Sequence, residues 1–484
     1  MSEAIDKEST LGNLPDEWPS SLMSTIAERV ALDDQTIVVL DDDPTGTQTV
    51  YDLPVITEWS LETLDAEFSR GTPAFYIMTN SRSLTPDAAE VLNKEIATRL
   101  LVTAEKYDRR LSIVSRSDST LRGHYPLETD AIADTLQTLG KGGSIDGQII
   151  APFFLEGGRL TIDDVHYVAE GSNLIPAAET PFAKDAAFGF TQSNLLDYVE
   201  EKSKGTIKKA EVQSITIDDV RRGGPERVRA KLKCLSNMQA CVVNAVSLRD
   251  MEVFALGLLD AEAKDMKRFV VRSAATFVQA RIGLPKRPIL TANAINNDDA
   301  LSSAAGGKKT GGLVVVGSYV PKTTAQLESL LALDGMEKIE INVLDLIDSE
   351  KRPTTISSTL DQVQKAIACG KNTVVYTSRK LMTGNDPSES LTIGNSVSDG
   401  LVSIVSKLEV QPRFIIAKGG ITSSDVATKG LGIKRAMVLG QAAPGIPVWS
   451  IGEEGKFPGM SYVVFPGNVG GNDELSKLVS RLSV

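Results

Sequence analysis

The chain has 484 residues, of which 42% are hydrophobic and 24% charged, and its formal net charge is −12 at pH 7. This length is too great for one comfortable hydrophobic core and predicts two large domains of a globular protein. The acidic balance argues against nonspecific nucleic-acid binding, which needs a basic surface, so no nucleic-acid partner is expected. No stretch approaches the roughly 18 to 20 unbroken apolar residues of a membrane-spanning helix, so no membrane partner is expected either.

The few cysteines and histidines also limit the classes of site. Cys234, Cys241 and Cys369 are odd in number and widely spaced, which argues against a disulfide framework. With only His124 and His166 as histidines, a histidine-based zinc centre is not expected. The first residues lack a basic segment followed by an apolar one, so no secretory signal is visible and a cytoplasmic location is predicted.

Residues 1–35 are polar and predict an N-terminal extension with one short helix over residues 19–31. After this extension, apolar strand-like runs alternate with helical patterns over residues 86–106 and 126–139. Such alternation is typical of βαβ units and predicts a mainly parallel sheet. We therefore predict a first α/β domain over residues 36–285.

A shift in composition follows this first domain. Residues 286–312 are rich in Gly, Asn, Asp and Lys, which suits an exposed linker. Residues 313–484 then repeat the alternation, so the fold class is α/β with two domains, each with a mainly parallel β-sheet flanked by helices. The second domain is expected to have strands near residues 313–316, 342–344, 373–376, 414–417 and 462–465, and a last helix over residues 473–482.

Three predicted strands of the first domain end abruptly in polar residues. The apolar run at residues 36–40 leads into three consecutive aspartates. Neighbouring carboxylates repel one another, so their place at the end of a buried strand indicates that negative charge is needed there. The runs at residues 74–78 and 111–114 lead into Thr-Asn-Ser-Arg-Ser and Ser-Arg-Ser-Asp-Ser-Thr-Leu-Arg-Gly-His. Because the carboxyl ends of neighbouring parallel strands converge on one crevice, these segments predict three walls of one polar site.

Asp42 and Asp43 are the catalytic candidates in this site. A carboxylate at the end of a strand could accept a proton from a substrate hydroxyl. The sequence Asp-Pro-Thr-Gly is also a strong turn former, so the aspartates could instead belong to a capped turn with solvated charges. Both interpretations stay open.

The substrate-binding candidates are the neighbouring hydrogen-bond donors and charges. Arg82 and Arg159 could each hold a carboxylate with two parallel hydrogen bonds, or could be surface residues. Asp118, Arg122 and His124 could line a pocket for a ligand that carries hydroxyls and a carboxylate. The same three residues could equally form a structural ion pair beside a partly buried histidine.

Three glycine-rich strand-to-helix junctions distinguish the second domain. They cover residues 317–324, 418–425 and 465–472. Glycines permit close backbone approach, and free N–H groups at helix starts favour an anion, so the junctions together predict a phosphate cradle. Each loop alone could be a simple turn, and the Walker and dinucleotide spacings are absent. The cofactor-binding candidates are Ser318, Lys418, Gly419, Gly420, Ile421, Thr422, Ser423, Gly467, Asn468 and Gly470.

Taken in order, these motifs resemble the four-carbon acid sugar kinase family. The resemblance covers roughly residues 36–475. The motifs are Asp-Asp-Pro-Thr-Gly at 42–46, Ser-Asp-Ser-Thr-Leu-Arg-Gly-His at 117–124, Ala-Pro-Phe-Phe-Leu-Glu-Gly-Gly-Arg at 151–159, Glu-Thr-Pro-Phe-Ala-Lys-Asp at 179–185 and Lys-Gly-Gly-Ile-Thr-Ser at 418–423.

The resemblance implies an ATP-dependent kinase that phosphorylates the terminal hydroxyl of a sugar acid such as threonate, erythronate or 3-oxo-tetronate. It implies that the N-terminal domain holds the sugar acid and the C-terminal domain holds ATP, with Mg²⁺ implied by ATP chemistry rather than by a ligand motif. The chain departs from the family pattern at three positions. Pro44 stands where the family usually has an apolar residue, and Val320 stands where it has a serine. Ile421 stands where the family often has an acidic residue. The resemblance places Asp42, Asp43, Arg82, Asp118, Arg122 and His124 at the sugar-acid side, and Ser318, Gly419, Gly420, Thr422, Ser423 and Gly467 at the nucleotide side.

Two other functions remain alternatives at this stage. A noncatalytic sensor would keep the sugar-acid pocket without phosphoryl transfer. A nucleotide-dependent oxidoreductase could use the same α/β plan, although the missing dinucleotide glycines count against it. A homodimer is one expectation for the assembly, which the sequence does not determine.

Overall fold

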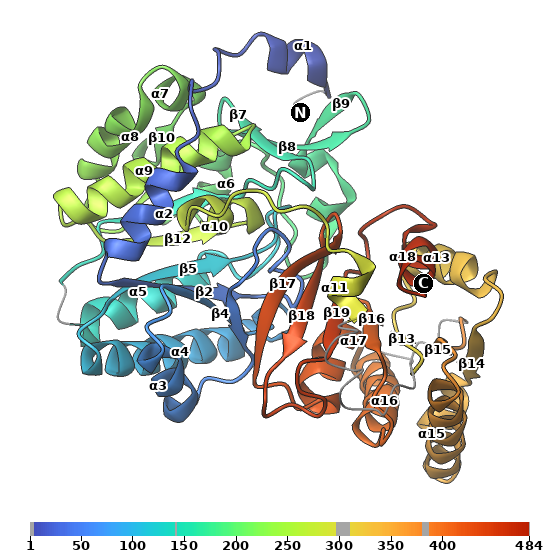
Figure 1. Cartoon of the computed structure of the whole chain (residues 1–484). Coiled ribbons are helices and arrows are strands. Elements are labelled where there is room, and N and C mark those ends of the chain that lie inside the picture. Colours follow the sequence, from blue (N-terminus) through green and yellow to red (C-terminus); the bar gives the residue numbers. More distant parts are fainter. Residues whose placement is uncertain (1–3, 141–142, 297–309, 380–386, 484) are drawn as a thin grey trace. The chain divides into compact units, whose positions relative to one another are not determined.

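The computed structural model describes residues 4–140, 143–296, 310–379 and 387–483. The chain divides into two compact units, each built around a β-sheet with helices, which confirms the predicted fold class (Figure 1). Much of the segment predicted as a linker, residues 297–309, lies outside the described residues. Unit 1 consists of Met1–Val50 and Glu58–Lys286, and unit 2 consists of Tyr51–Thr57 and Arg287–Val484.

The strands of the main sheet in unit 1 all run parallel, in the order β10-β11-β6-β12-β5-β2-β4. Its central strands are buried along nearly their whole length, because a parallel sheet is covered on both faces. This burial explains the continuous apolar runs in the sequence. The strands are β2 (Gln35–Asp41), β4 (Ala74–Met78), β5 (Arg110–Arg116), β6 (Gly147–Ala151), β10 (Gln213–Ile215), β11 (Gln239–Val243) and β12 (Phe269–Ser273).

Helices cover both faces of this sheet. Helices α3, α4 and α5 lie on one face, and α2, α9 and α10 lie on the other (Figure 1). Helix α4 begins where the sequence predicts, because Thr85 caps its first turn and Pro86 occupies an early position. The helices are α1 (Lys7–Gly12), α2 (Met23–Leu32), α3 (Leu61–Ser69), α4 (Pro86–Lys106), α5 (Leu127–Leu139), α6 (Leu195–Lys202), α7 (Ile217–Arg221), α8 (Gly224–Lys233), α9 (Leu248–Lys264) and α10 (Ala275–Arg281), with short 3-10 turns η1 (Ser81–Ser83), η2 (Ala177–Glu179), η3 (Pro181–Lys184) and η4 (Lys209–Glu211).

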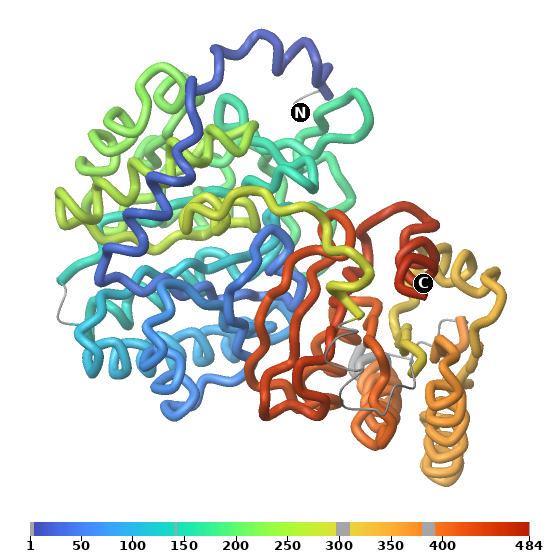
Figure 2. The backbone as a smooth tube through the Cα atoms, viewed as in Figure 1, coloured from blue at the N-terminus to red at the C-terminus, as the bar shows by residue number. Residues whose placement is uncertain are grey.

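The N-terminal segment packs against unit 1. Figure 2 shows its dark blue trace running beside α9 and α10, with which α2 is in contact. The ring of Trp18 lies over Gly224, where a Cβ would come within 2.4 Å of it. The segment also adds strand β1 to a small antiparallel sheet of order β1-β9-β8-β7, formed by β1 (Ile5–Asp6), β7 (Arg159–Ile162), β8 (Val165–Glu170) and β9 (Asn173–Pro176).

The sheet of unit 2 is mixed. Strands β3, β17, β18 and β19 pair antiparallel, and β19, β16, β13, β15 and β14 continue in parallel. The strand expected at residues 342–344 is wrong, because Asn342 caps the helix α14 there and the strand precedes it. The strands are β3 (Pro54–Ile56), β13 (Leu313–Val316), β14 (Glu337–Ile341), β15 (Thr373–Thr377), β16 (Phe414–Lys418), β17 (Arg435–Ala443), β18 (Ile446–Ile451) and β19 (Ser461–Phe465).

The core of unit 2 lies between its sheet and the helices α13 and α18. Val314 and Val463 from the sheet pack in one buried cluster with Leu327 and Leu478 from these helices. The helices of unit 2 are α11 (Ala292–Asn296), α13 (Pro321–Leu331), α14 (Val343–Ile347), α15 (Arg352–Ala368), α16 (Pro387–Ser406), α17 (Gly420–Asp425) and α18 (Glu474–Leu482), with a π-helical turn η5 (Val426–Gly430) after α17.

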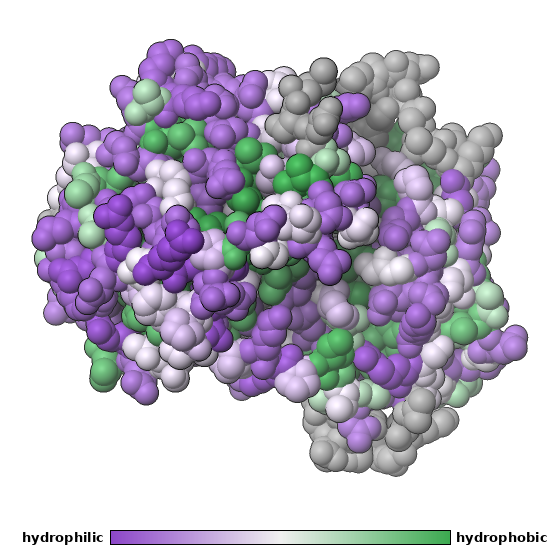
Figure 3. All heavy atoms as spheres, turned by 90° about the horizontal axis from the view of Figure 1, so that it is seen from above, coloured by the Kyte–Doolittle hydropathy of each residue, from purple (hydrophilic) through white to green (hydrophobic). Residues whose placement is uncertain are grey.

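Hydrophilic residues cover most of the face shown in Figure 3. Among the described residues, no helix combines the length and the apolar character that crossing a bilayer requires.

Candidate active site

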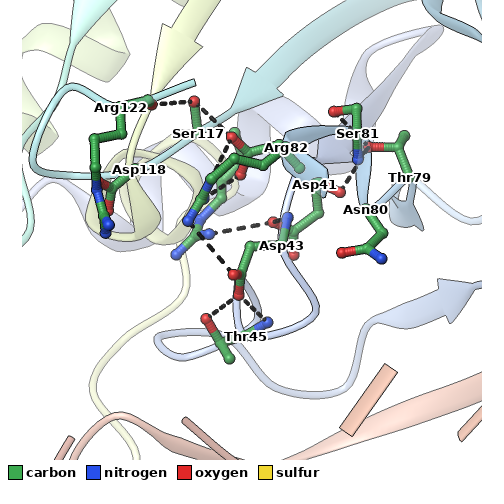
Figure 4. A network of polar contacts seen from close by, with 12 residues as sticks. Asp41, Asp43, Thr45, Thr79, Asn80, Ser81, Arg82, Ser117, Asp118 and Arg122 are labelled. Carbon is green, nitrogen blue, oxygen red and sulfur yellow. Dashed lines mark hydrogen bonds and ion pairs between the residues drawn. The ribbon is translucent and has the colours of Figure 1, made fainter. Parts of the chain in front are cut away.

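The three polar strand ends of unit 1 come together as predicted. Strands β4 and β5 flank β2, and the register pairs Asp41 with Met78 on one side and with Arg116 on the other. The residues that follow these strands therefore meet at one edge of the sheet, and Figure 4 shows their polar contacts. The edge carries both acidic and basic side chains.

Asp41 lies below the loop that follows β2. Its carboxylate accepts from Arg116 Nη1 at 3.2 Å, and both side chains are buried. Burial raises the pKa of Asp41 to about 7, although Arg116 opposes this shift. A Cβ on Gly46 would lie 1.9 Å from the Asp41 carboxylate, so only glycine lets the loop close over it.

Asp42 is buried and fully engaged by neighbouring donors. Arg82 donates to it through Nε at 3.1 Å and through Nη2, in the forked geometry of an arginine–carboxylate pair. Ser117 Oγ donates to Oδ2 of Asp42 at 2.8 Å. With only 3% of its side chain exposed, Asp42 has little surface left for a ligand.

Asp43 is the more accessible of the two catalytic candidates, since 24% of its side chain is exposed. It accepts from the backbone N–H of Thr45 at 2.9 Å, from the Thr45 hydroxyl, and from Arg82 Nη1 at 3.4 Å. Burial opposes its ionisation, but the Arg82 guanidinium and the Thr45 donors hold the pKa of Asp43 below its usual value. Asp43 is therefore a charged, partly exposed carboxylate at neutral pH.

Asp118 and Arg122 form an ion pair, with Arg122 Nε 2.7 Å from the Asp118 carboxylate. Burial opposes ionisation of Asp118, but Arg82 and Arg122 hold its pKa well below the usual range. The ring of Phe182 lies 5.2 Å from the guanidinium carbon of Arg122 and 5.7 Å from that of Arg159. Among the described residues, no carboxylate lies within ion-pair distance of Arg159, which makes its guanidinium the less compensated of the two.

His124 links two of the polar segments. Its Nε2 donates to the carbonyl of Leu84 at 3.1 Å, and its ring meets Phe188 edge-on at 4.9 Å. Burial lowers the pKa of His124, so the ring is neutral at pH 7. These contacts favour a structural role in holding the segment after β5 against the turn after β4.

The loop of residues 117–124 turns its carbonyl groups inward. Buried side chains donate to them. His166 Nε2 donates to the Ser119 carbonyl at 2.8 Å, and Tyr198 Oη donates to the Leu121 carbonyl at 2.8 Å. Arg272 Nη2 donates to the Leu121 carbonyl at 3.3 Å and to the Arg122 carbonyl at 3.1 Å. In a trans peptide the N–H points opposite to the C=O. The next N–H groups therefore point away from these donors, and no described residue accepts from those of Thr120, Arg122 and Gly123.

Unit 2 places Lys418 beneath a second loop, residues 466–471. Lys418 is the last residue of β16 and is fully buried. Its Nζ donates to the carbonyls of Pro466 and Gly467 at 2.5 and 3.2 Å and lies 4.2 Å from the ring centre of Phe465. Burial lowers the pKa of Lys418 to about 7, and nearby Lys322 acts in the same direction. Lys418 therefore holds the loop from inside.

Two further buried side chains hold the same loop. Thr323 donates to the carbonyl of Gly467 at 3.3 Å, and Gln326 donates to the carbonyls of Val469 and Gly471 at 2.9 and 2.7 Å. As in unit 1, inward carbonyls leave the following N–H groups facing outward. No described residue accepts from the N–H groups of Gly467, Asn468 and Gly470, which is the arrangement expected of an anion cradle.

The other candidates of unit 2 lie around the end of β16. Gly419 has a φ of +112°, and a Cβ there would lie 2.7 Å from Ser318, which brings these two loops together. Ile421 is 66% exposed, and it follows Gly420 at the start of α17. Thr422 and Ser423 are buried, and Ser423 donates to the carbonyl of Ala417 at 2.7 Å, so that its hydroxyl is already engaged.

Sequence reasoning missed several residues of these sites. Arg379 follows β15 and donates to the Ser318 carbonyl at 2.6 Å, while its Nε and Nη1 have no partner among the described residues. Arg272 ends an apolar run in β12 just as Asp41 ends β2, so the same strand-end signal could have found it. Gln326 lies within a helix and leaves no comparable signal.

The described part of the chain contains no group of three or more His, Cys, Asp or Glu side chains placed to hold a metal ion. A protein-built metal cage is therefore absent from these residues. Mg²⁺ usually binds through substrate phosphates, one or two carboxylates and water, which does not require such a cage.

Comparison with known proteins assigns a description to each half of the chain. Residues 37–281 match a family model described as a sugar-binding N-terminal domain, and residues 313–475 match one described as a nucleotide-binding C-terminal domain. No curated protein matches the chain.

Two solved structures share the fold over 92% of this chain. The Haemophilus influenzae protein HI1011 is 19% identical, is covered over its whole length and has a TM-score of 0.59. A putative tRNA synthase from Salmonella typhimurium LT2 is 18% identical, is covered over 98% of its length and has a TM-score of 0.63. At 19% and 18% identity, these two structures support the fold of this chain and not its function. The two family models, which together span most of both units, show that the chain belongs to the four-carbon acid sugar kinase family.

Proposed function

We propose that this protein transfers a phosphoryl group from ATP to the terminal hydroxyl of a four-carbon sugar acid of the threonate, erythronate or 3-oxo-tetronate type. The observation that carries this proposal is the Asp42–Arg82–Asp43 network at the carboxyl edge of the unit 1 sheet. Residues 36–285 would hold the sugar acid, and residues 313–484 would hold the nucleotide. The two family descriptions support this division.

Asp43 is the proposed base. Its carboxylate is charged and partly exposed, whereas Asp42 is buried and engaged by Arg82 and Ser117. Phosphoryl transfer depends mainly on alignment and charge stabilisation, and a carboxylate that orients the attacking hydroxyl meets the first need. Asp42 then acts by fixing Arg82, which in turn fixes Asp43.

The carboxylate of the sugar acid would bind to Arg122 and Arg159. Arg82 directs its N–H groups to Asp42 and Asp43, which leaves it little capacity for a second carboxylate. Arg159 has no carboxylate partner among the described residues, and its guanidinium and that of Arg122 both lie against the ring of Phe182. Two guanidiniums on one ring suit a planar anion.

The phosphates of ATP would bind to the outward N–H groups of the loop at residues 466–471, with Ser318 and the loop at residues 419–423 beside them. Bound ATP supplies the transferable phosphoryl group, and Mg²⁺ would accompany its phosphates. The geometry fits, since Gly467 offers open space: a Cβ there would meet nothing closer than 3.8 Å. Lys418 adds a buried amino group below the loop, which is positively charged below pH 7.

The test is ADP release with ATP and Mg²⁺ on a panel of D- and L-threonate, D- and L-erythronate, their 3-oxo forms and glycerate. A strong response to one four-carbon acid supports the proposal and names the substrate. Melting shifts with these acids and with ATP, measured in parallel, report binding. Binding of both ligands without ADP release would replace the kinase by a sensor, and binding of neither would remove both functions.

A further inference from the structure

We propose that Arg272 is a positioning residue for the acidic network of unit 1, an inference that rests on the proposed function. Arg272 lies near the end of β12, between β5 and β6, and only 2% of it is exposed. No carboxylate lies within ion-pair distance of it in the described part of the chain. A buried cation without a direct counterion is costly, so its contacts call for an explanation.

Arg272 directs one nitrogen at the loop that follows β5. Its Nη2 donates to the carbonyls of Arg122 and Leu121 and lies 3.5 Å from Ser117 Oγ. The ring of Tyr125 supports the guanidinium at 5.2 Å. Arg272 thus contacts both the loop backbone and the Ser117 hydroxyl, which donates to Asp42.

In these contacts Ser117 Oγ accepts from Arg272 and donates to Asp42. A guanidinium can only donate, so Ser117 Oγ accepts from Arg272 and keeps its own proton to give away. Two acceptors are in reach of that proton: Asp42 Oδ2 at 2.8 Å and the Arg122 carbonyl at 3.2 Å. The Asp42 carboxylate is the closer of the two acceptors, and hydrogen bonds to a carboxylate are the stronger kind, so the hydroxyl is directed to Asp42.

The result is a continuous series of hydrogen bonds from the buried strand β12 to the proposed base, Asp43. Arg272 orients Ser117, Ser117 holds Asp42, and Asp42 holds Arg82 against Asp43. Gly123 leaves room for this series of hydrogen bonds. A Cβ at Gly123 would lie 2.6 Å from Ser117 Oγ, 3.2 Å from Asp42 Oδ2 and 3.8 Å from Arg272 Nη2.

Arg272→Gln tests this role, with Tyr198→Phe as the matched control. Tyr198 donates to the same Leu121 carbonyl as Arg272 but does not contact Ser117. We expect Arg272→Gln to lower kcat about ten- to hundred-fold with little change in the KM for ATP, as a displaced catalytic geometry does. Tyr198→Phe should cost about two-fold at most. Equal losses from the two variants would mean that Arg272 only supports the loop.

A double-mutant cycle with Ser117→Ala isolates the coupling. If Arg272 acts through Ser117, the double variant should lose no more activity than the worse single variant, because both remove the same link. Additive losses in kcat would overturn the proposal. Melting curves identify any variant whose loss comes from unfolding.

A structural readout separates this inference from the proposed function. In a crystal structure of Arg272→Gln, Ser117 Oγ should move beyond hydrogen-bond distance of Asp42, whether or not the wild-type protein releases ADP. An unchanged Ser117–Asp42 hydrogen bond would overturn the positioning role even in an active enzyme. If the wild type releases no ADP but this hydrogen bond is broken in the variant, the positioning role stands and the kinase is removed.

Discussion

The loop at residues 117–124 of unit 1 and the loop at residues 466–471 of unit 2 share one construction and differ in their side chains. In both, buried donors bind the carbonyl groups and leave neighbouring N–H groups without acceptors among the described residues. The unit 1 loop adds the charged pair Asp118 and Arg122, whereas residues 466–471 carry no charged side chain.

This difference matches two kinds of recognition. A cradle made of backbone N–H groups contacts only the anionic group of a ligand and not the rest of the molecule, which suits phosphates. Charged side chains fixed in pairs read the positions of several groups on a small molecule, which suits a sugar acid. If the comparison is right, damage to each region should affect a different ligand.

The largest expected effect comes from Asp43→Asn. Without its charge, residue 43 can no longer orient and deprotonate a hydroxyl, and we expect turnover to fall about 10³-fold. Titration calorimetry with ADP should show nearly unchanged affinity, because the substitution leaves unit 2 intact. Near-normal turnover would remove Asp43 as the base.

Lys418→Met tests the opposite side of the comparison. Loss of the donor that holds the Pro466 and Gly467 carbonyls should raise the KM for ATP about ten-fold and leave sugar-acid affinity unchanged. Lys429→Met, an exposed position of unit 2, is the control.

The same variant makes a prediction about pH. The pKa of Lys418 is about 7, so this residue loses its positive charge as the pH rises from 6 to 8. Its contribution to ATP affinity should fall over that range in the wild type and be missing in Lys418→Met. The measurement is the ratio of the two dissociation constants at each pH, which cancels the titration of ATP itself. A ratio that does not change with pH would contradict the prediction.

Gly467→Ala adds a single methyl group to the loop at residues 466–471 and tests whether a phosphate approaches its backbone closely. A Cβ at this position meets no protein atom closer than 3.8 Å, so the melting temperature should change by about 1 °C or less. We expect the KM for ATP to rise several-fold, because the methyl group would occupy the space where a phosphate oxygen approaches the backbone. Gly12→Ala, with nothing near its Cβ, serves as the control. An unchanged KM would argue against close contact at this loop.

The last prediction concerns stability in unit 1 rather than activity. Glu128 is buried and accepts from Ser81 and Asn93, and burial, together with nearby Asp42, raises its pKa to about 7. Between the usual carboxyl pKa and pH 7, the unfolded chain releases this proton more readily than the folded one. Stability contributed by neutral Glu128 is therefore present at low pH and is lost as the pH rises toward 7.

Glu128→Gln should remove this loss. We expect the variant to become more stable relative to the wild type as the pH rises from 5 to 8. The difference in melting temperature between the two should increase over this range, and the difference in the free energy of unfolding should not exceed about 3 kcal/mol. Asp134→Asn, an exposed position on the same helix, is the matched control. A difference that stays constant with pH, or that matches the control, would contradict a buried neutral Glu128.

The strands of the parallel sheets were predictable because burial on both faces leaves a continuous apolar run. β2, β4, β5 and β13 all follow this pattern. β14 was missed because it is an edge strand in which only Ile339 and Ile341 are buried, and the apolar pair after it belongs to a helix. A half-exposed edge strand produces a weak local signal.

The candidate site shows the same division. The strand-end motifs were enough by themselves to locate Asp42, Asp43, Arg82 and the loop at residues 117–124, because polar residues at the end of a buried strand are conspicuous. The distinct environments of the three aspartates were not predictable. They depend on Arg116, Arg82 and Ser117, which lie on other strands or loops and reach the aspartates only in the folded chain.

The sequence by itself determined the two α/β halves, the polar strand ends and the glycine-rich junctions, because these follow from local periodicity and turn chemistry. Only the tertiary structure decided which carboxylate is exposed, that Arg159 and Arg272 lack a counterion among the described residues, and which carbonyls are held from inside. It also joined residues 51–57 to the second unit, through the pairing of β3 with β17. Such facts depend on contacts between residues far apart in the chain, and no local pattern encodes them.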